Sequence, residues 1–252
     1  MVYMNRLIRL AVVTLGFLSV PFSNLHAKFV VVAPRVEQAA LKADARALHA
    51  SGILQSLTAE LNELFVIPER IEILFAECGE ANAFFSSDDA EITICIELIE
   101  DMQDSLSESY PDQAERDAIV EGALTGTLLH EVGHALVSVL ELPITGREED
   151  AVDQLSTWIL IEAEMPDSVL SGAEIYYLAE DSQDDETYAG EHSLNRQRYF
   201  NMVCWVYGSD SENNQHLLDE WKLPEARAEQ CESEYELMRN SWATLLGDHI
   251  RD

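Results

Sequence analysis

Two histidines stand four residues apart in the run HEVGH, and a glutamate directly follows the first of them. In a helix, residues four apart lie on one face with about 5–6 Å between Cβ atoms, so His130 and His134 can present two imidazoles to one ion. Zinc accepts such nitrogen ligands in a tetrahedral arrangement. Glu131 then lies where it can take a proton from a zinc-bound water and pass it to a leaving amine. The run therefore predicts the core of a zinc-hydrolase site.

The surroundings of this run strengthen the metal-site interpretation, because the pattern HExxH alone also occurs by chance. Histidine and glutamate side chains in an apolar helix face are costly to bury without a partner. The neighbours here are uncharged: Leu128, Leu129, Val132, Ala135 and Leu136. Gly133 leaves room for another element to approach the helix closely. The alternative is a histidine pair, in the core or on the surface, that holds no metal.

A catalytic zinc needs a third protein ligand, and the residues after His134 restrict where that ligand comes from. The three-histidine pattern of metzincins continues as HExxHxxGxxH. This chain has Val137 and Leu140 at the corresponding positions, which excludes that pattern. The third ligand is therefore expected from the acidic run 148–153, which opens the next helix.

Within the acidic run, Glu149 and Asp153 are four residues apart and have the E-x-x-x-D arrangement seen in gluzincins. The likeness implies that Glu149 ligates zinc from a second helix, while Asp153 hydrogen-bonds the free N–H of a ligand histidine. Glu148, Asp150 and Asp153 remain alternative ligands. Acidic side chains also favour a helix N-terminus without any metal, which explains one or two of these acids but not the whole set.

Zinc peptidases usually stabilise the oxyanion of the reaction with a His or Tyr from a later element. We expect His192 to have this role, as a catalytic residue beside Glu131. Arg198 and Tyr199, on the helix that follows, are the alternatives. A lone histidine at a helix start is more often a capping or structural residue, and Arg198 has many carboxylates with which it can pair.

Hydrophobic periodicity and the Pro and Gly breaks predict a helix-rich α+β fold with a small mixed sheet near the N-terminus and a two-helix zinc site. Strands are expected at 29–33, 71–75 and 91–96. Helices are expected at 36–65, 97–107, 112–140, 147–164, 169–180, 193–207, 223–231 and 232–246. The strand 91–96 is a candidate for the sheet edge that holds an extended peptide by backbone pairing.

Four cysteines, an even number, indicate disulfides in an exported chain. Cys78 and Cys95 flank a candidate hairpin, and Cys204 and Cys231 lie together in the C-terminal part. We therefore expect the sequential pairing among the three possible connectivities. A four-thiolate zinc site is the alternative, but no C-x-x-C spacing supports it.

Residues 1–27 have the pattern of an export signal peptide. Arg6 and Arg9 supply a positively charged segment before the apolar stretch 10–20, and 25–27 is a plausible cleavage site. A retained N-terminal anchor is the alternative. No later segment has the roughly 18 uncharged apolar residues of a membrane span. We therefore expect a single domain at 28–252, in the periplasm or secreted, without stable membrane insertion after signal removal.

The chain is strongly acidic, with 15 basic and 47 acidic residues and a formal net charge of −32. Such a field repels nucleic acid and anionic membrane surfaces, so neither is expected as a partner. The expected partner is a peptide or protein substrate. The oligomeric state does not follow from the sequence.

The runs LLHEVGHALV and GREEDAVDQ resemble a bacterial family of candidate zinc metallopeptidases that was long known only as a domain of unknown function. The runs CGEANAFF, ITICIEL and EHSLNRQRYFNMVCWVYGSD are similar to the same family. The resemblance spans most of the chain after the signal segment. It implies a zincin-like fold, one zinc ion per chain and peptidase-type chemistry, and it leaves the substrate open.

These observations favour an exported zinc metallopeptidase, a hydrolase that cleaves peptide bonds with a water activated by Glu131. The alternative is a non-catalytic, zinc-stabilised binding module on a zincin scaffold. Glu131 argues against that alternative, because a structural zinc site has no use for a general base and prefers four protein ligands. A third hypothesis is a hydrolase of non-peptidic amides that uses the same zinc site.

Overall fold

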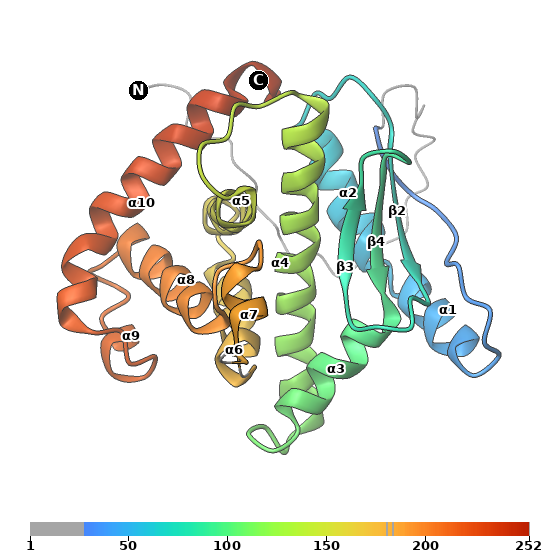
Figure 1. Cartoon of the computed structure of the whole chain (residues 1–252), viewed down its shortest axis with the longest axis horizontal. Helices are drawn as coiled ribbons and strands as arrows, with labels where there is room; N and C mark the ends of the chain where they lie inside the picture. The colour runs from blue at the N-terminus through green and yellow to red at the C-terminus, as the bar shows by residue number, and fades with distance from the viewer. Residues whose placement is uncertain (1–27, 180, 183, 252) are drawn as a thin grey trace, which may run out of the picture.

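A mixed four-stranded sheet stands beside a long central helix in the computed structural model, which describes residues 28–179, 181–182 and 184–251 (Figure 1). The strand order is β1-β2-β4-β3, with β1 at Phe29–Val31, β2 at Ile71–Ala76, β3 at Ala83–Ser86 and β4 at Glu91–Cys95. The first three strands in this order run parallel, whereas β3 is antiparallel to β4 and lies at one edge. The expected signal segment 1–27 lies outside the described residues.

The rest of the described chain is mostly helical, which confirms the expected helix-rich α+β class. The helices are α1 Leu41–Ser51, α2 Ile53–Leu64, α3 Ile96–Leu106, α4 Gln113–Val139, α5 Glu148–Glu162, α6 Pro166–Leu178, α7 Asp185–Ala189, α8 Asn195–Ser209, α9 His216–Asp219 and α10 Glu225–Leu246. Among the described residues, none of these helices has both the length and the apolar character needed to cross a membrane.

Helix α4 lies between the two halves of the molecule (Figure 1). It contacts β3 and β4 on one side and α5 and α6 on the other. The helix begins where the sequence predicts, because the Asp112 side chain accepts a hydrogen bond from the Glu115 amide at 3.0 Å and satisfies a free N–H of the first turn. Leu128, Val132 and Leu136 are fully buried on α4. The part of α4 that contains the HEVGH run is therefore fixed in the core.

Three local predictions are wrong, each for a physical reason. The expected helix 36–65 is interrupted at Gly52, whose φ of 82° is left-handed and ends α1 before α2 begins. The expected helices 223–231 and 232–246 are one continuous helix, α10. Strand β3 was not predicted, and β4 pairs with β2 on one side and β3 on the other, so 91–96 is not the sheet edge.

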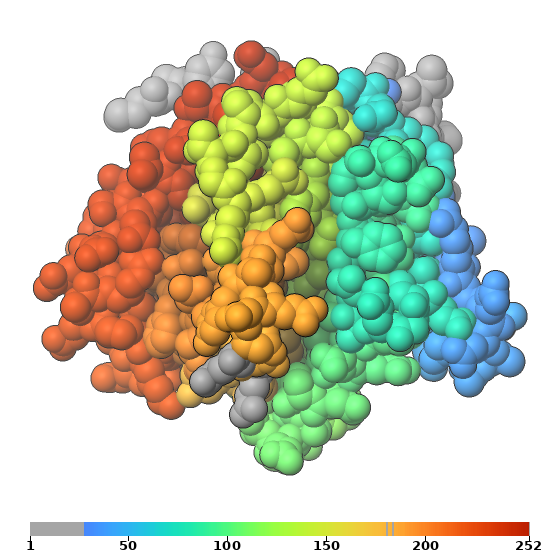
Figure 2. Space-filling view, viewed as in Figure 1, coloured from blue at the N-terminus to red at the C-terminus, as the bar shows by residue number. Residues whose placement is uncertain are grey.

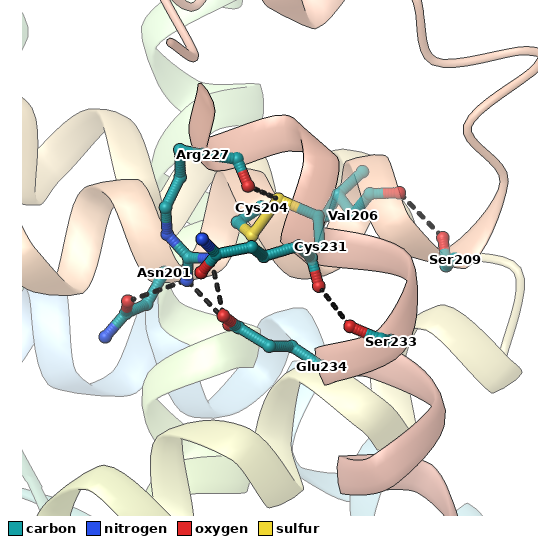
Figure 3. The surroundings of a disulfide bond; sticks show 9 residues. Asn201, Cys204, Val206, Ser209, Arg227, Cys231, Ser233 and Glu234 are labelled. Atoms are coloured by element: carbon teal, nitrogen blue, oxygen red, sulfur yellow. Dashed lines mark hydrogen bonds and ion pairs between the residues drawn. A yellow bond between two sulfur atoms is a disulfide. The ribbon is translucent and has the colours of Figure 1, made fainter. Parts of the chain in front are cut away.

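Helices α8 and α10 are joined by a disulfide between Cys204 and Cys231 (Figure 3). One turn further along α8, a Cβ on Gly208 would lie 2.1 Å from the carbonyl oxygen of Cys231. The missing side chain therefore allows the two backbones to approach at this point. Helix α8 is held firmly against α10, which matters because α8 also carries Arg198.

The second disulfide joins Cys78 to Cys95, so both bridges have the sequential pairing expected from the sequence. Cys78 precedes the segment that leads into β3, and Cys95 is the last residue of β4. Glu97, in the first turn of α3, accepts hydrogen bonds from the backbone amides of Cys78 at 3.2 Å and Gly79 at 2.8 Å. The entry to the edge strand is therefore attached to the sheet and to α3.

Candidate metal centre and cleft

Helices α4 and α5 approach each other closely at Gly133, and this contact brings the HEVGH run next to the acidic run. A Cβ on Gly133 would lie 2.8 Å from the Cβ of Val152. Helix α5 can come this near because residue 133 has no side chain. Glu149 and Asp153 lie on either side of Val152 in the sequence, and both reach His130 from α5.

Four side chains converge at one point of the cleft. The Nε2 atoms of His130 and His134 are 3.2 Å apart. The Oε2 atom of Glu149 lies 3.1 Å from the first of these nitrogens and 3.4 Å from the second. His192 brings its own Nε2 to 2.9 Å from the same oxygen. The structure therefore brings together the three residues expected as metal ligands and the histidine expected to stabilise the oxyanion.

Two further carboxylates hold the histidine rings in orientation. Nδ1 of His130 donates to Oδ1 of Asp153 at 2.7 Å, and Nδ1 of His134 donates to Oε1 of Glu148 at 2.7 Å. An ionised carboxylate can accept hydrogen bonds but cannot donate them, so the ring hydrogens are on the Nδ1 atoms. In the neutral form of each ring, which a metal requires, the lone pair is therefore on Nε2 and faces the centre of the cluster.

This donor set fits a zinc ion. Two nitrogen lone pairs and a carboxylate oxygen at separations of 3.1–3.4 Å repel one another unless a positive charge lies among them. A tetrahedral zinc with bonds of about 2.0–2.1 Å requires ligand atoms roughly 3.3 Å apart. The observed separations are close to that value. Thiolate ligands are excluded because all four cysteines are in disulfides.

The neighbouring charges shift the pKa values of the candidate ligand side chains. Burial disfavours a charge on His130, but its hydrogen bonds to Asp153 and Glu149 outweigh burial and raise its pKa to about 9. Burial also opposes the charge of Glu149, and hydrogen bonds from three histidines outweigh it, so the pKa of Glu149 lies far below its usual range. The cluster is therefore arranged to hold a positive charge at its centre.

Glu131 lies beside the cluster but outside this set of contacts. It is 5% exposed, and burial raises the pKa of its carboxyl above the ordinary value. A raised pKa moves a carboxylate toward the neutral range, in which a general base works best. The side chain lines both the open cleft and a smaller cavity behind it.

Arg198 supports the cluster from α8. Its Nε and Nη2 donate to the two carboxylate oxygens of Asp153, each at 2.7 Å. Burial opposes the negative charge of Asp153, but the Arg198 charge and the His130 hydrogen bond outweigh it and hold the Asp153 pKa well below its usual range. Arg198 thus keeps Asp153 ionised, and Asp153 keeps the hydrogen of His130 on Nδ1.

The segment before α8 is attached to the start of α5 and to the residue that precedes it. Nη1 of Arg147 donates to the carbonyl oxygen of His192 at 3.1 Å, and Oγ of Ser193 donates to Oδ1 of Asp150 at 2.6 Å. The side chain of His192 is nevertheless 56% exposed. This histidine therefore combines a fixed backbone with an accessible ring, whereas the rings of His130 and His134 are much less exposed.

The cluster opens into a cleft of about 960 Å³. Residues 82–85 of the sheet edge line one wall, and residues 189–192 line the wall opposite. Figure 2 shows this groove between the surface of the edge strand and the orange surface that includes α7. Phe84 is 40% exposed along the first wall. Among the described residues, no strand pairs with the outer edge of β3, which borders this wall.

The sequence did not identify the contacts that Glu148 and Arg198 make. Glu148 was considered as a ligand, but it contacts the outer nitrogen of His134. Arg198 and Tyr199 were alternatives for the oxyanion. Instead, Arg198 pairs with Asp153, and the hydroxyl of Tyr199 donates to the carbonyl oxygen of Trp221 at 2.6 Å. A carboxylate partner was the default expectation for Arg198, but nothing in the sequence identified which carboxylate.

The comparisons with known proteins give one finding. A family model, DUF4344, described as "Putative metallopeptidase", matches residues 34–246. No curated protein and no solved structure matches the chain. The matched range includes α4, α5 and the segment that carries His192, and therefore every element that contributes to the cluster.

Proposed function

The chain belongs to this metallopeptidase family, and from that premise we propose that it is an exported zinc-dependent peptidase that hydrolyses peptide bonds. The observation that carries the proposal is the inward-facing donor set. Nε2 of His130, Nε2 of His134 and Oε2 of Glu149 lie within 3.4 Å of one another, and outer hydrogen bonds hold both imidazoles in the tautomer that a metal requires.

His130, His134 and Glu149 would hold the ion, and Glu131 would act as the general base. When bound, zinc supplies a Lewis acid that polarises the scissile carbonyl and makes a water molecule more acidic. The Glu131 carboxylate takes a proton from the water as the water oxygen attacks the carbonyl carbon. The same carboxyl then gives that proton to the amine nitrogen as the carbon–nitrogen bond breaks. The burial of Glu131 supports this role because it raises the pKa of the carboxyl and so makes the carboxylate a better proton acceptor.

His192 is proposed to stabilise the oxyanion. Its Nε2 lies 2.9 Å from Oε2 of Glu149, and its ring is accessible from the cleft, so a substrate carbonyl can approach it. A hydrogen bond from His192 to the developing negative charge would strengthen in the transition state. The attachment of its backbone to Arg147 keeps the ring near the cluster before substrate arrives.

The fold around this site is proposed to be zincin-like, formed by a single domain over 28–252. The support is a metal-site helix beside a sheet whose edge strand, β3, is antiparallel to its neighbour. An extended substrate would pair with β3 along its free edge. Export is proposed from the pattern of residues 1–27, and the two disulfides fit an oxidising compartment.

The test combines metal content with a substitution of the base. Protein prepared without chelators is expected to contain one zinc per chain. A Glu131→Gln variant is expected to keep that zinc and to lose cleavage of a mixed peptide library by at least about 10³-fold, because the substitution removes a proton acceptor but no ligand. Zinc content near zero in both proteins would sink the proposal.

The binding-module alternative makes a different prediction in the same experiment. If wild type and Glu131→Gln both hold zinc and neither cleaves any peptide, the chain is a zinc-stabilised binding module. Cleavage of simple amides but not of the peptide library would instead favour the non-peptidic hydrolase. These outcomes therefore distinguish the three functions without a prior choice of substrate.

A second measurement separates two roles for His192. A histidine that stabilises the oxyanion can be replaced by Gln with a loss of kcat of about 10²-fold and little change in zinc affinity. Replacement of a histidine that ligates the ion would lower the zinc affinity. Competition titration of His192→Gln against a coloured chelator distinguishes these results, with His134→Gln as the ligand control.

A further inference from the structure

A second cavity, of about 210 Å³, lies behind the candidate metal centre. It shares five lining residues with the open cleft, namely Asn82, Ala83, His130, Glu131 and His192. A group that enters the cleft and reaches the cluster can therefore continue into this cavity. Its volume exceeds the roughly 150 Å³ of a buried cavity that holds benzene, so it is large enough for one sizeable side chain.

The cavity lies along the same faces of α4 and α5 that carry the candidate metal ligands. On α4 it is lined by Ala123, Gly126 and Thr127, which precede His130 by seven to three residues and share its face. On α5 it is lined by Asp153 and Thr157, which follow Glu149 at intervals of four. With a rise of 1.5 Å per residue, the cavity extends about 10 Å away from the cluster.

Two of the lining residues are helical glycines that helix packing does not explain. Glycine inside a helix lowers stability relative to alanine, so it normally marks a close contact. That reason holds for Gly122, where a Cβ would lie 2.6 Å from Oγ of Ser171, and for Gly133 at α5. At Gly126 a Cβ would make ordinary contacts at 3.9 Å or more, and at Gly172 it would meet nothing within 4 Å.

Gly172 belongs to the face of α6 that is directed at the cavity. Ser168, Gly172 and Tyr176 are spaced by four residues and all line it. A side chain at position 172 would therefore project into the empty volume without displacing a neighbour. The absence of side chains at Gly126 and Gly172 therefore keeps the cavity open.

Thr157 supplies an independent indication that the cavity takes a ligand. The residue is 1% exposed, it lines the cavity, and its hydroxyl has no hydrogen-bond partner among the described residues. A buried hydroxyl without a partner is destabilising. Whatever fills the cavity is therefore expected to meet a hydrogen-bonding group on the wall whose hydroxyl is not yet satisfied.

We propose that this cavity is the pocket that selects the substrate, and that it receives one uncharged, largely apolar side chain next to the scissile bond. Its size limit is set by Gly126 and Gly172. The proposal rests on the proposed peptidase function. Apolar side chains form much of the wall, among them Leu98, Met102, Leu160, Val169, Ile175 and Met202.

The charges around the pocket exclude ionised side chains. Asp153 and Arg198 line it, but they pair with each other through two hydrogen bonds of 2.7 Å. Glu131 lies at the mouth, which it shares with the cleft. A carboxylate would be repelled by Glu131 at the mouth. An ammonium group would lose its hydration against inner walls that offer it hydroxyls, while their carboxylate, Asp153, is already paired with Arg198.

Chelating probes test the pocket without catalysis. Hydroxamates that carry hydrogen, isobutyl, benzyl, carboxymethyl or aminobutyl as their side chain are titrated into the zinc-loaded protein by calorimetry. The isobutyl and benzyl probes are expected to bind about 10- to 100-fold more tightly than the hydrogen probe, as burial of that apolar area implies. The carboxymethyl and aminobutyl probes are expected to show no such gain.

Gly172→Leu fills the pocket and is expected to abolish the gain for isobutyl and benzyl while the hydrogen probe binds within about twofold of wild type. Gly172→Ala, the milder variant, is expected to reduce the gain for benzyl more than for isobutyl. Gly247→Leu is the matched control: a Cβ at this helical glycine also meets nothing within 4 Å, but the residue lies outside both cavities. It should bind every probe as wild type does.

Two results would overturn the pocket assignment alone. One is equal affinity of wild type for all five probes, and the other is a Gly172→Leu variant that keeps the wild-type gain or weakens the hydrogen probe as much as the isobutyl probe. Failure of the hydrogen probe to bind wild type, together with zinc content near zero, would overturn the proposed function and the pocket with it. The two kinds of failure are therefore distinguishable.

Discussion

Arg198 and Asp153 form a two-point ion pair in the interior, with side chains that are 10% and 6% exposed. Nε of Arg198 donates to Oδ2 and Nη2 donates to Oδ1, both at 2.7 Å. The Oδ1 atom also accepts the hydrogen bond from Nδ1 of His130. One carboxylate oxygen thus joins α8 to the candidate metal ligand on α4, so the position of α8 affects the orientation of His130.

Replacement of Arg198 by Met is expected to lower both stability and metal affinity. The variant keeps much of the side-chain volume but leaves the Asp153 charge buried without its main partner, which costs about 3–5 kcal/mol. Loss of an outer partner of a ligand histidine reduces metal affinity by about 10- to 100-fold. Denaturant unfolding of the metal-free protein measures the first effect, and chelator competition measures the second.

Arg227 and Glu234 provide a control, a two-point ion pair at a more exposed position. They also form two hydrogen bonds of 2.7 Å, but their side chains are 26% and 38% exposed. Arg227→Met is therefore expected to cost about 0–1 kcal/mol and to leave zinc affinity unchanged. Arg198→Lys should recover part of the zinc affinity. A metal affinity of Arg198→Met equal to wild type would show that the pair acts on folding alone.

Removal of the metal is expected to lower Tm. A ligand that binds the folded state stabilises it by about 2.7 kcal/mol at a free concentration of 100 Kd. For a chain of this size, 1 kcal/mol corresponds to roughly 2–4 °C, so chelation should lower Tm by about 5–10 °C. Differential scanning calorimetry with and without zinc measures the shift. Glu131→Gln should show the full shift, whereas Glu149→Gln should show much less; a zinc-independent Tm in wild type would contradict the ligand assignment.

The long central elements were predictable because their signals are local. The expected helix 112–140 is α4, Gln113–Val139, since Pro111 and Asp112 mark its start and the apolar pattern continues over many turns. Strand β3 was missed because four residues without clear alternation become a strand only through pairing with β4. The break at Gly52 was missed because glycine in a helical pattern is also compatible with an uninterrupted helix.

The site could be predicted as a set of residues but not as a set of contacts. The acidic run contains Glu148 and Glu149 side by side, and successive positions on a helix differ by about 100° in direction. That rotation directs Glu149 at the inner nitrogens and Glu148 at the outer nitrogen of His134. Similarly, Arg198 contacts Asp153 across 45 residues of sequence, and with 47 acidic residues in the chain the partner depends on the tertiary fold.

Substitution of Gly208 by Ala is expected to be strongly destabilising. The new Cβ would lie 2.1 Å from the carbonyl oxygen and 2.4 Å from the carbonyl carbon of Cys231, and these backbone atoms cannot move without shifting α10. Overpacking of this kind costs about 1–3 kcal/mol or more. Thermal or denaturant unfolding under non-reducing conditions measures it. Gly247→Ala, at a position with open space, should stay within about 1 kcal/mol of wild type; equal stability of the two variants would contradict the close approach of α8 and α10.

The hydrogen bonds of Glu97 predict an acid-dependent loss of stability at the entry to the edge strand. Burial opposes the Glu97 charge, but backbone amides, including those of Gly79 and Cys78, outweigh it and lower the pKa of the carboxyl below its ordinary value of 4.5. A lowered pKa means that the folded state binds this proton less readily than the unfolded state. The stabilising contribution is therefore complete above about pH 4.5 and is lost as the pH falls through the folded-state pKa.

Glu97→Gln tests this dependence, since the amide oxygen can still accept a hydrogen bond but carries no charge at any pH. Wild type is expected to be more stable than the variant by about 1 kcal/mol at pH 6–7, as for a partly exposed charge-assisted bond. The difference should shrink as the pH falls below 4.5. Denaturant unfolding at several pH values gives the difference curve, and Glu100→Gln on the exposed part of α3 serves as the control. A difference that grows toward low pH would have the wrong sign for a carboxylate held ionised by the backbone of Cys78 and Gly79.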